Sequence, residues 1–76
     1  MTYREMYDDV MESGKYNSHL QKIKRLAQLI FANHRADPLY KKSDAVWEAL
    51  EKYEDMSGCY FDPTFAQFDD IVASIA

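Results

Sequence analysis

The sequence holds few of the residues that build small rigid sites. Its 76 residues include one cysteine, Cys59, together with two histidines, two glycines and two prolines. A single cysteine excludes an internal disulfide, and the shortage of Cys and His excludes the usual zinc-binding frameworks. The two isolated glycines, Gly14 and Gly58, cannot form a glycine-rich phosphate loop. We therefore expect no metal and no cofactor.

Long apolar runs are also missing. The longest, Leu29 to Ala32, is far short of the roughly 20 residues that a membrane-spanning helix needs. Charged Arg4 and Glu5 stand close to the beginning, where a secretory signal would place an apolar core. A lone thiol without disulfides fits a reducing compartment. These features predict a cytoplasmic protein without a membrane association.

Apolar residues are nonetheless plentiful, at 47% of the chain, so a folded core is expected. The length predicts one domain over residues 1–76. A domain of this size buries only about 60% of the surface of its unfolded chain and leaves little volume for a deep substrate pocket. We therefore do not expect an enzyme, and we expect a partner or a second copy to contribute to stability.

Apolar residues recur with helical spacing, and no segment alternates as a strand would. Thr2 with Glu5, and Ser18 with Gln21, have the spacing of helix-capping pairs. Ser43 is expected to cap a third helix, and Asp62 with Pro63 a fourth. The sequence therefore predicts an all-α fold, a small compact bundle of four short helices, with bounds at about residues 3–13, 19–35, 44–57 and 63–75.

The periodic pattern also predicts which side chains form the core. On each expected helix the apolar residues fall on one stripe, which should face the other helices. The expected core residues are Tyr7, Val10, Ile23, Leu26, Ile30, Val46, Leu50, Phe65, Phe68 and Val72.

The net charge of −4 hides a segregation of charge along the chain. Residues 15–36 carry five basic residues and no acid, whereas residues 43–57 carry five acids and one lysine. Four of these acids recur at helical spacing and are expected to share one solvent-facing side. This stripe, our first candidate partner-binding site, consists of Asp44, Glu48, Glu51 and Asp55. It fits a solvated face or one that the basic second helix neutralises, and it equally fits a surface that meets a basic partner or imitates a phosphate backbone.

The basic second helix is the alternative candidate. Its partner-binding residues would be Lys22, Lys24 and Arg25 on the polar side, with Leu29 as an exposed apolar contact. Such an arrangement could meet phosphates. However, the field of an acidic protein opposes the approach of nucleic acid, so direct binding is the weakest hypothesis.

Three functions follow in order of preference. The first is a small acidic interaction protein that binds and modulates or inhibits a protein partner with a basic surface. Proteins of this size and charge are common among inhibitors encoded by phages and mobile elements, including mimics that cover nucleic-acid-binding surfaces. The second is a structural or accessory subunit of a homo-oligomer, and the third is nucleic-acid binding through the basic helix. His19 and His34 lie too far apart on one helix to share a metal, so no catalytic or metal site is expected.

Overall fold

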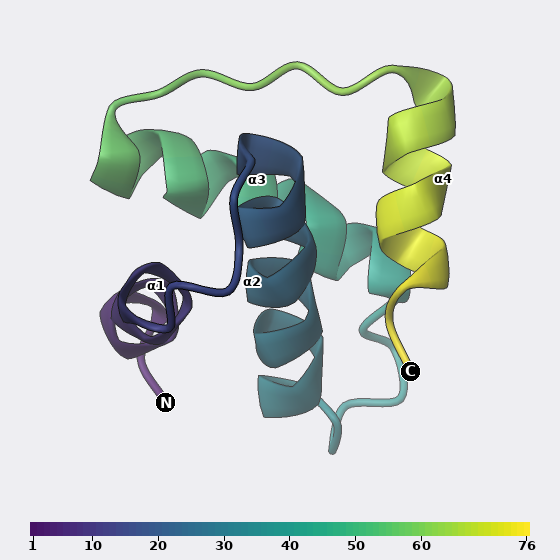
Figure 1. The fold of residues 1–76 in the computed structure, drawn as a ribbon. Helices are drawn as coiled ribbons and strands as arrows, with labels where there is room; N and C mark the ends of the chain where they lie inside the picture. Colours follow the sequence, from purple (N-terminus) through teal and green to yellow (C-terminus); the bar gives the residue numbers. More distant parts are fainter.

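Four helices follow one another along the chain, and the computed structural model describes all 76 residues. They are α1 (Tyr3–Glu12), α2 (His19–Asn33), α3 (Lys42–Ser57) and α4 (Phe65–Ala73), shown in Figure 1. No residue forms a strand, so the expected all-α bundle of four helices is confirmed. None of the four helices combines the length and the apolar character needed to cross a bilayer.

The beginnings of α1 and α2 agree with the sequence pattern. The Thr2 hydroxyl accepts a hydrogen bond from the Glu5 backbone N–H at 3.1 Å, and the Glu5 carboxylate accepts one from the Thr2 N–H at 2.9 Å. The Ser18 hydroxyl accepts the Gln21 N–H at 3.2 Å. These bonds satisfy N–H groups that lack a partner within the helix. The end of α2 differs slightly, because the helix stops at Asn33 and a turn replaces its expected last residues.

The beginnings of α3 and α4 differ from the prediction. Helix α3 starts at Lys42, so Ser43 lies inside its first turn and is not the cap. The expected cap Asp62 of α4 is also wrong, because Thr64 takes this position and Phe65 begins the helix. Thr64 and Gln67 exchange two hydrogen bonds, at 2.9 and 3.2 Å, between the side chain of each and the backbone of the other. This reciprocal pair fixes the start of α4 two residues later than Asp62 and Pro63 suggested.

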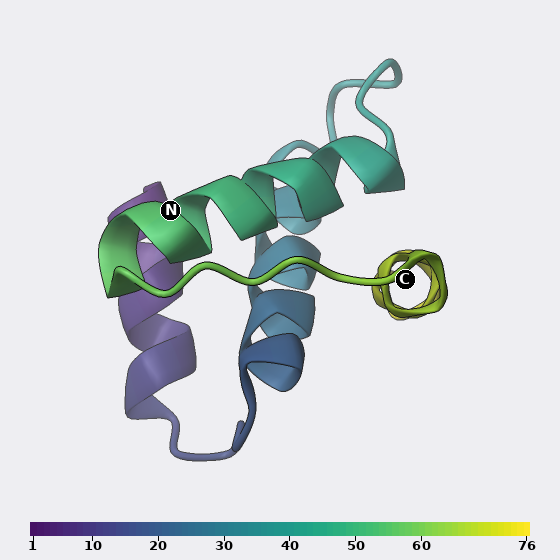
Figure 2. The ribbon, with the colours of Figure 1, turned by 90° about the horizontal axis from the view of Figure 1, so that it is seen from above.

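Helix α2 is the central element and packs against the other three helices. Helices α1 and α4 flank it, and each also packs on α3, which crosses α2 (Figures 1 and 2). Gly58 ends α3 with a φ of +75°, a left-handed conformation that glycine adopts without strain. A connector, residues 59–64, then runs extended from the end of α3 across the molecule to α4. No backbone N–H between Cys59 and Pro63 donates to a backbone carbonyl.

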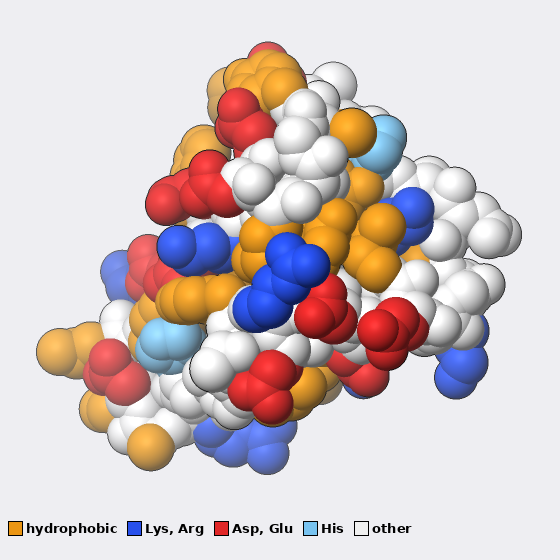
Figure 3. Space-filling view, turned by 90° about the vertical axis from the view of Figure 1, so that its left-hand side faces the viewer, with side chains coloured by type: hydrophobic (Ala, Val, Ile, Leu, Met, Phe, Trp, Pro, Cys, Tyr) orange, Lys and Arg blue, Asp and Glu red, His pale blue; other side chains and the backbone are white.

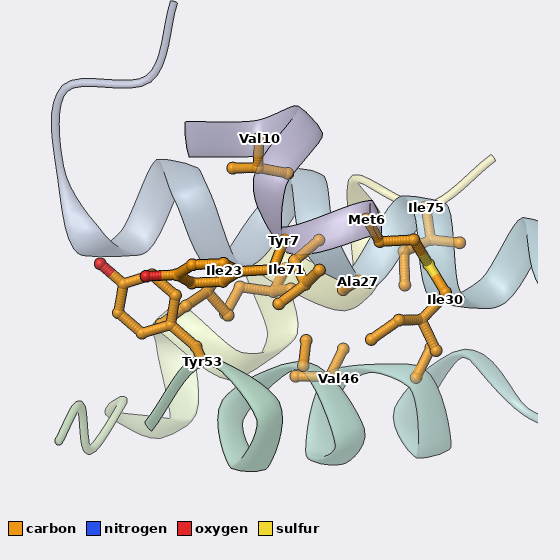
Figure 4. Packing of buried hydrophobic residues seen from close by; sticks show 13 residues of the cluster. Met6, Tyr7, Val10, Ile23, Ala27, Ile30, Val46, Tyr53, Ile71 and Ile75 are labelled. Carbon is orange, nitrogen blue, oxygen red and sulfur yellow. The ribbon is translucent and has the colours of Figure 1, made fainter. Parts of the chain in front are cut away.

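The core lies where the four helices meet (Figure 4). Three fully buried alanines, Ala27, Ala45 and Ala49, allow α2 and α3 to approach closely. The other buried residues are Met6, Tyr7, Val10, Ile23, Leu26, Ile30, Val46, Tyr53, Ile71 and Ile75. Most of the expected core is therefore found. Leu50, Phe68 and Val72 are only half-buried, and Phe65, which was expected in the core, is almost completely exposed.

Candidate interaction surface

The acidic stripe on α3 divides into two parts. Three of its residues are exposed, namely Asp44, Glu51 and Asp55. Glu48 is half-buried, and its two carboxylate oxygens accept hydrogen bonds from the phenols of Tyr3 and Tyr40, the second at 2.9 Å. The sequence pattern missed this role because both tyrosines lie outside α3: Tyr3 begins α1, and Tyr40 precedes α3. Glu48 holds the start of α1 and the segment before α3 against α3, so it is not free to meet a partner.

The electrostatics of the two phenols agree with this role. The hydrogen bond to Glu48, followed by burial, raises the pKa of Tyr3 from 10.0 to about 12. Burial, followed by the hydrogen bond to Glu48, also raises the pKa of Tyr40. Both shifts arise because a phenolate would lie beside a carboxylate with reduced access to water. At neutral pH both phenols therefore remain neutral donors.

The exposed acids of the stripe are not neutralised by the basic helix. The carboxylate of Asp44 accepts the backbone N–H of Lys41 at 2.9 Å and so caps α3. The carboxylate of Glu51 lies 4.0 Å from the ammonium of Lys52, at the outer limit of an ion pair. No acid of the stripe forms an ion pair with the candidate basic residues Lys22, Lys24 and Arg25. Three carboxylates of this face thus remain exposed to solvent.

The basic residues of α2 are only half-exposed. Lys24 is paired with Asp70 of α4 at 2.6 Å, and Arg25 donates to the side-chain oxygen of Gln28 at 3.2 Å. Leu29 is half-buried and packs against the core, so it is less exposed than its position in the pattern suggested. Lys22 is also half-buried. The pairing of Lys24 leaves fewer free cations for a phosphate backbone than the sequence implied.

A surface that the sequence pattern missed lies between α3 and the start of α4. A cleft of about 420 Å³ is lined by Trp47, Asp62, Pro63, Thr64, Phe65 and Phe68. Trp47 is 62% exposed and Phe65 is 93% exposed, although both are large aromatic residues. The rings of Trp47 and Phe68 are in contact, with centroids 5.0 Å apart and planes at 48°. The chain thus presents an aromatic cleft in place of part of its expected core.

The angular position of Phe65 on α4 explains its exposure. Phe65 is the first helical residue, and Ile71, which is fully buried, follows six residues later. At about 100° per residue, the two side chains point about 120° apart around the helix. With Ile71 and Ile75 directed into the core, Phe65 must project away from it. The apolar pattern of α4 spans a stripe about 120° wide, with Phe65 at one edge and Ile71 at the other, so burial of the Ile71 edge leaves Phe65 outside the core.

Acidic residues surround this cleft. On α3, Glu51 lies one turn after Trp47 and Asp44 one turn before it, so both share the exposed side of the helix. On α4, Asp69 lies one turn after Phe65. We call this region the aromatic–acidic surface, and it comprises Trp47, Pro63, Phe65 and Phe68 with Asp44, Glu51, Asp62 and Asp69. On another face, the left-hand side of Figure 1, acidic and basic side chains are intermixed (Figure 3).

The residues most often used in catalysis lie apart from this surface. His19 contacts the hydroxyl of Tyr53 through its Nδ1 atom. His34 stacks on Tyr40, with ring centroids 3.9 Å apart, and its Nδ1 lies 2.9 Å from the Ile30 carbonyl oxygen. Cys59 is exposed in the connector. No three residues among His, Cys, Asp and Glu are grouped so that they could hold a metal ion. Each histidine is thus in contact with a tyrosine.

Comparisons of the chain with models of protein families, with curated proteins and with solved structures find no match.

Proposed function

We propose that this chain is a protein-interaction module that binds a basic partner through its aromatic–acidic surface and modulates or inhibits that partner by covering it. The observation that carries the proposal is the exposure of Trp47 and Phe65 on the two sides of one cleft. In a chain of 76 residues these two aromatic side chains could have enlarged a small core, but they lie together at the surface. Exposed apolar side chains that lie side by side are typical of interaction sites.

The aromatic side chains supply the affinity in this proposal. A Trp or Phe side chain buries about 150–250 Å² when it is covered, and about 25 cal/mol is gained per Å² of apolar area. Only part of this gain becomes binding free energy, because association also costs entropy and desolvation. Tryptophan is enriched among the residues that dominate binding energy. Trp47 is therefore the proposed anchor, and an apolar side chain of the partner would occupy the cleft beside it.

The acidic residues specify the kind of partner. Asp62 lines the cleft, and Glu51 and Asp69 lie one helical turn from Trp47 and Phe65. Among these three acids only Glu51 has a basic side chain within 4.0 Å, that of Lys52. A basic surface on the partner would be attracted by these carboxylates, which raises the rate of encounter more than the final affinity. Many basic protein surfaces bind nucleic acid. An inhibitor that covers such a surface is the form of modulation that this charge pattern favours.

Selection from a library of displayed random peptides tests the proposed chemistry without a known partner. We expect selected peptides to combine an apolar anchor with Lys or Arg. Trp47→Ala should weaken a selected peptide by about tenfold or more, as truncation of an anchor residue does. Leu39→Ala is the matched control, because Leu39 is 84% exposed but lies outside the aromatic–acidic surface. Enrichment of acidic peptides, or equal binding by the Trp47 variant, would refute the proposal.

Association kinetics give a second readout with the same peptide. Glu51→Gln combined with Asp62→Asn should slow association, and the difference from wild type should disappear at high salt. Both residues are exposed, so the fold should be retained. Arg4→Gln is a suitable control, because it changes an exposed charge on α1. An association rate that is insensitive to salt and to the paired substitution would show that charge does not guide the partner.

A further inference from the structure

A second concave region runs along α2 and reaches the residues that follow α4, whereas the aromatic cleft lies at the beginning of α4. It consists of two adjoining hollows that share Arg25 and Gln28. One hollow, about 290 Å³, is polar and basic and is also lined by Lys15, Tyr16, Gln21 and Lys24. The other, about 320 Å³, has an apolar floor that includes Leu29, Phe31 and Ile75, with Arg35 at its edge. We call the pair the basic groove.

The charge of the basic groove is mostly uncompensated. Lys24 has a carboxylate partner in Asp70, but Arg25 and Arg35 form no ion pair. The arginine guanidinium matches the geometry of a carboxylate and is well suited to pairing at an interface. The apolar hollow between these two arginines therefore fits a ligand with an apolar side chain flanked by carboxylates. A chain of phosphates is a poorer fit, because it would leave the apolar floor of this hollow unfilled.

The same chain carries a protrusion with this composition. Phe65 projects from the start of α4 and is 93% exposed, with Asp62 three residues before it and Asp69 one turn after it. The aromatic cleft lies at the beginning of α4 beside α3, whereas the basic groove lies at the end of α4 beside α2. Phe65 begins α4 and Ile75 of the basic groove follows its end, so a molecule cannot place Phe65 in its own groove.

We infer that the basic groove binds a second copy of this chain, with Phe65 of one copy seated on the apolar floor between Arg25 and Arg35 of the next. Asp62 and Asp69 of the first copy then face these two arginines. The inference rests on the proposed function, since it uses part of the aromatic–acidic surface. The contact joins two different faces, so association continues from copy to copy unless the geometry closes a ring. A basic partner and a second copy compete for Phe65.

Sedimentation velocity of the wild-type chain and two variants tests this arrangement. Wild-type protein should associate as its concentration rises, and less strongly when salt is raised from about 0.01 M to about 1 M, because the Debye length falls from about 30 Å to about 3 Å. Phe65→Ala removes the protruding side chain. Arg25→Glu combined with Arg35→Glu reverses the charge at these two positions of the basic groove. Each variant alone should be monomeric, with its dissociation constant raised by about tenfold or more. Circular dichroism checks that each variant is folded. If the double variant unfolds, Arg35→Glu alone replaces it, because Arg35 is exposed.

Mixing the two variants gives the decisive result. The Phe65 variant retains a normal groove, and the arginine variant retains a normal protrusion. Together they should form a one-to-one dimer that does not grow further, because each has only one working face. Three results would overturn the inference: a wild-type chain that stays monomeric, variants that still associate, or a mixture that forms no dimer. If the wild type is monomeric but peptides still bind in a Trp47-dependent manner, the inference fails and the proposed function stands.

Discussion

Ile71 and Phe65 belong to the same apolar pattern of α4 but differ completely in burial. Ile71 is fully buried beneath the other helices, and Phe65 is 93% exposed. Replacing each by alanine therefore tests whether α4 is oriented as described. Ile71→Ala should destabilise the fold by about 2–5 kcal/mol, because it removes buried methyl and methylene groups and leaves a cavity. Phe65→Ala should change the free energy of unfolding by no more than about 0.5 kcal/mol.

The size of the domain makes this difference easy to measure. At roughly 0.05–0.15 kcal/mol per residue, a chain of 76 residues has about 4–11 kcal/mol of stability. Ile71→Ala thus removes a large share of it, and each kcal/mol lowers the melting temperature by about 4–8 °C. Urea denaturation followed by far-ultraviolet circular dichroism measures both variants at a dilution where the chain is monomeric. A loss of about 2 kcal/mol or more in Phe65→Ala would refute the orientation of α4 and, with it, the aromatic–acidic surface.

Three further predictions concern the elements that fix the helices. The hydrogen bond to Glu48 raises the pKa of Tyr3 from 10.0 to about 12, so this contact stabilises the fold fully below about pH 10 and is lost as pH rises towards 12. Glu48→Gln should lower the pKa of Tyr3, which the absorbance of tyrosinate reports. The same substitution should lower the free energy of unfolding by about 1–2 kcal/mol at neutral pH, measured by urea denaturation. An unchanged titration of Tyr3 would contradict the contact. Gly58→Ala should cost about 1–2 kcal/mol in thermal melts from backbone strain alone, since φ is +75° and an added Cβ meets nothing within 4 Å. Thr64→Ala should cost about 1 kcal/mol of stability through loss of the cap of α4, whereas Asp62→Ala should cost almost nothing in the same melts. The reverse order would show that Asp62 is the cap, as the sequence predicted.

The parts of the fold that follow from short-range rules were predictable from the sequence. The cap at Thr2 and the stripe containing Ile23, Leu26 and Ile30 depend only on residues within a few positions of each other. The start of α4 shows where such rules compete, because Asp62 with Pro63 and Thr64 with Gln67 are both good capping patterns. The pattern with two reciprocal hydrogen bonds is the one observed. The burial of Phe65 is a separate matter, because it depends on which edge of the apolar stripe of α4 faces the other helices, and this edge contains Ile71.

The candidate surface was less predictable because it depends on contacts between distant segments. Glu48 belongs to the acidic stripe by spacing, but Tyr3 and Tyr40 reach it from 45 and 8 residues away along the chain. Likewise, Trp47 meets Phe68 only because the connector returns the chain to α3. A helical pattern in one segment carries no information about such neighbours. The partner-binding role of Asp44, Glu51 and Asp55 stays a prediction.

The connector also has a consequence for the way in which the chain opens. Between Cys59 and Pro63 it has no backbone-to-backbone N–H bond to break, and α4 is only nine residues long. Release of α4 therefore separates few hydrogen bonds and leaves α1, α2 and α3 in contact with one another. Such a partial opening requires less free energy than global unfolding. The amide protons of α4 should exchange with solvent deuterium faster than those of α2, so the element that presents Phe65 is also the one that detaches first.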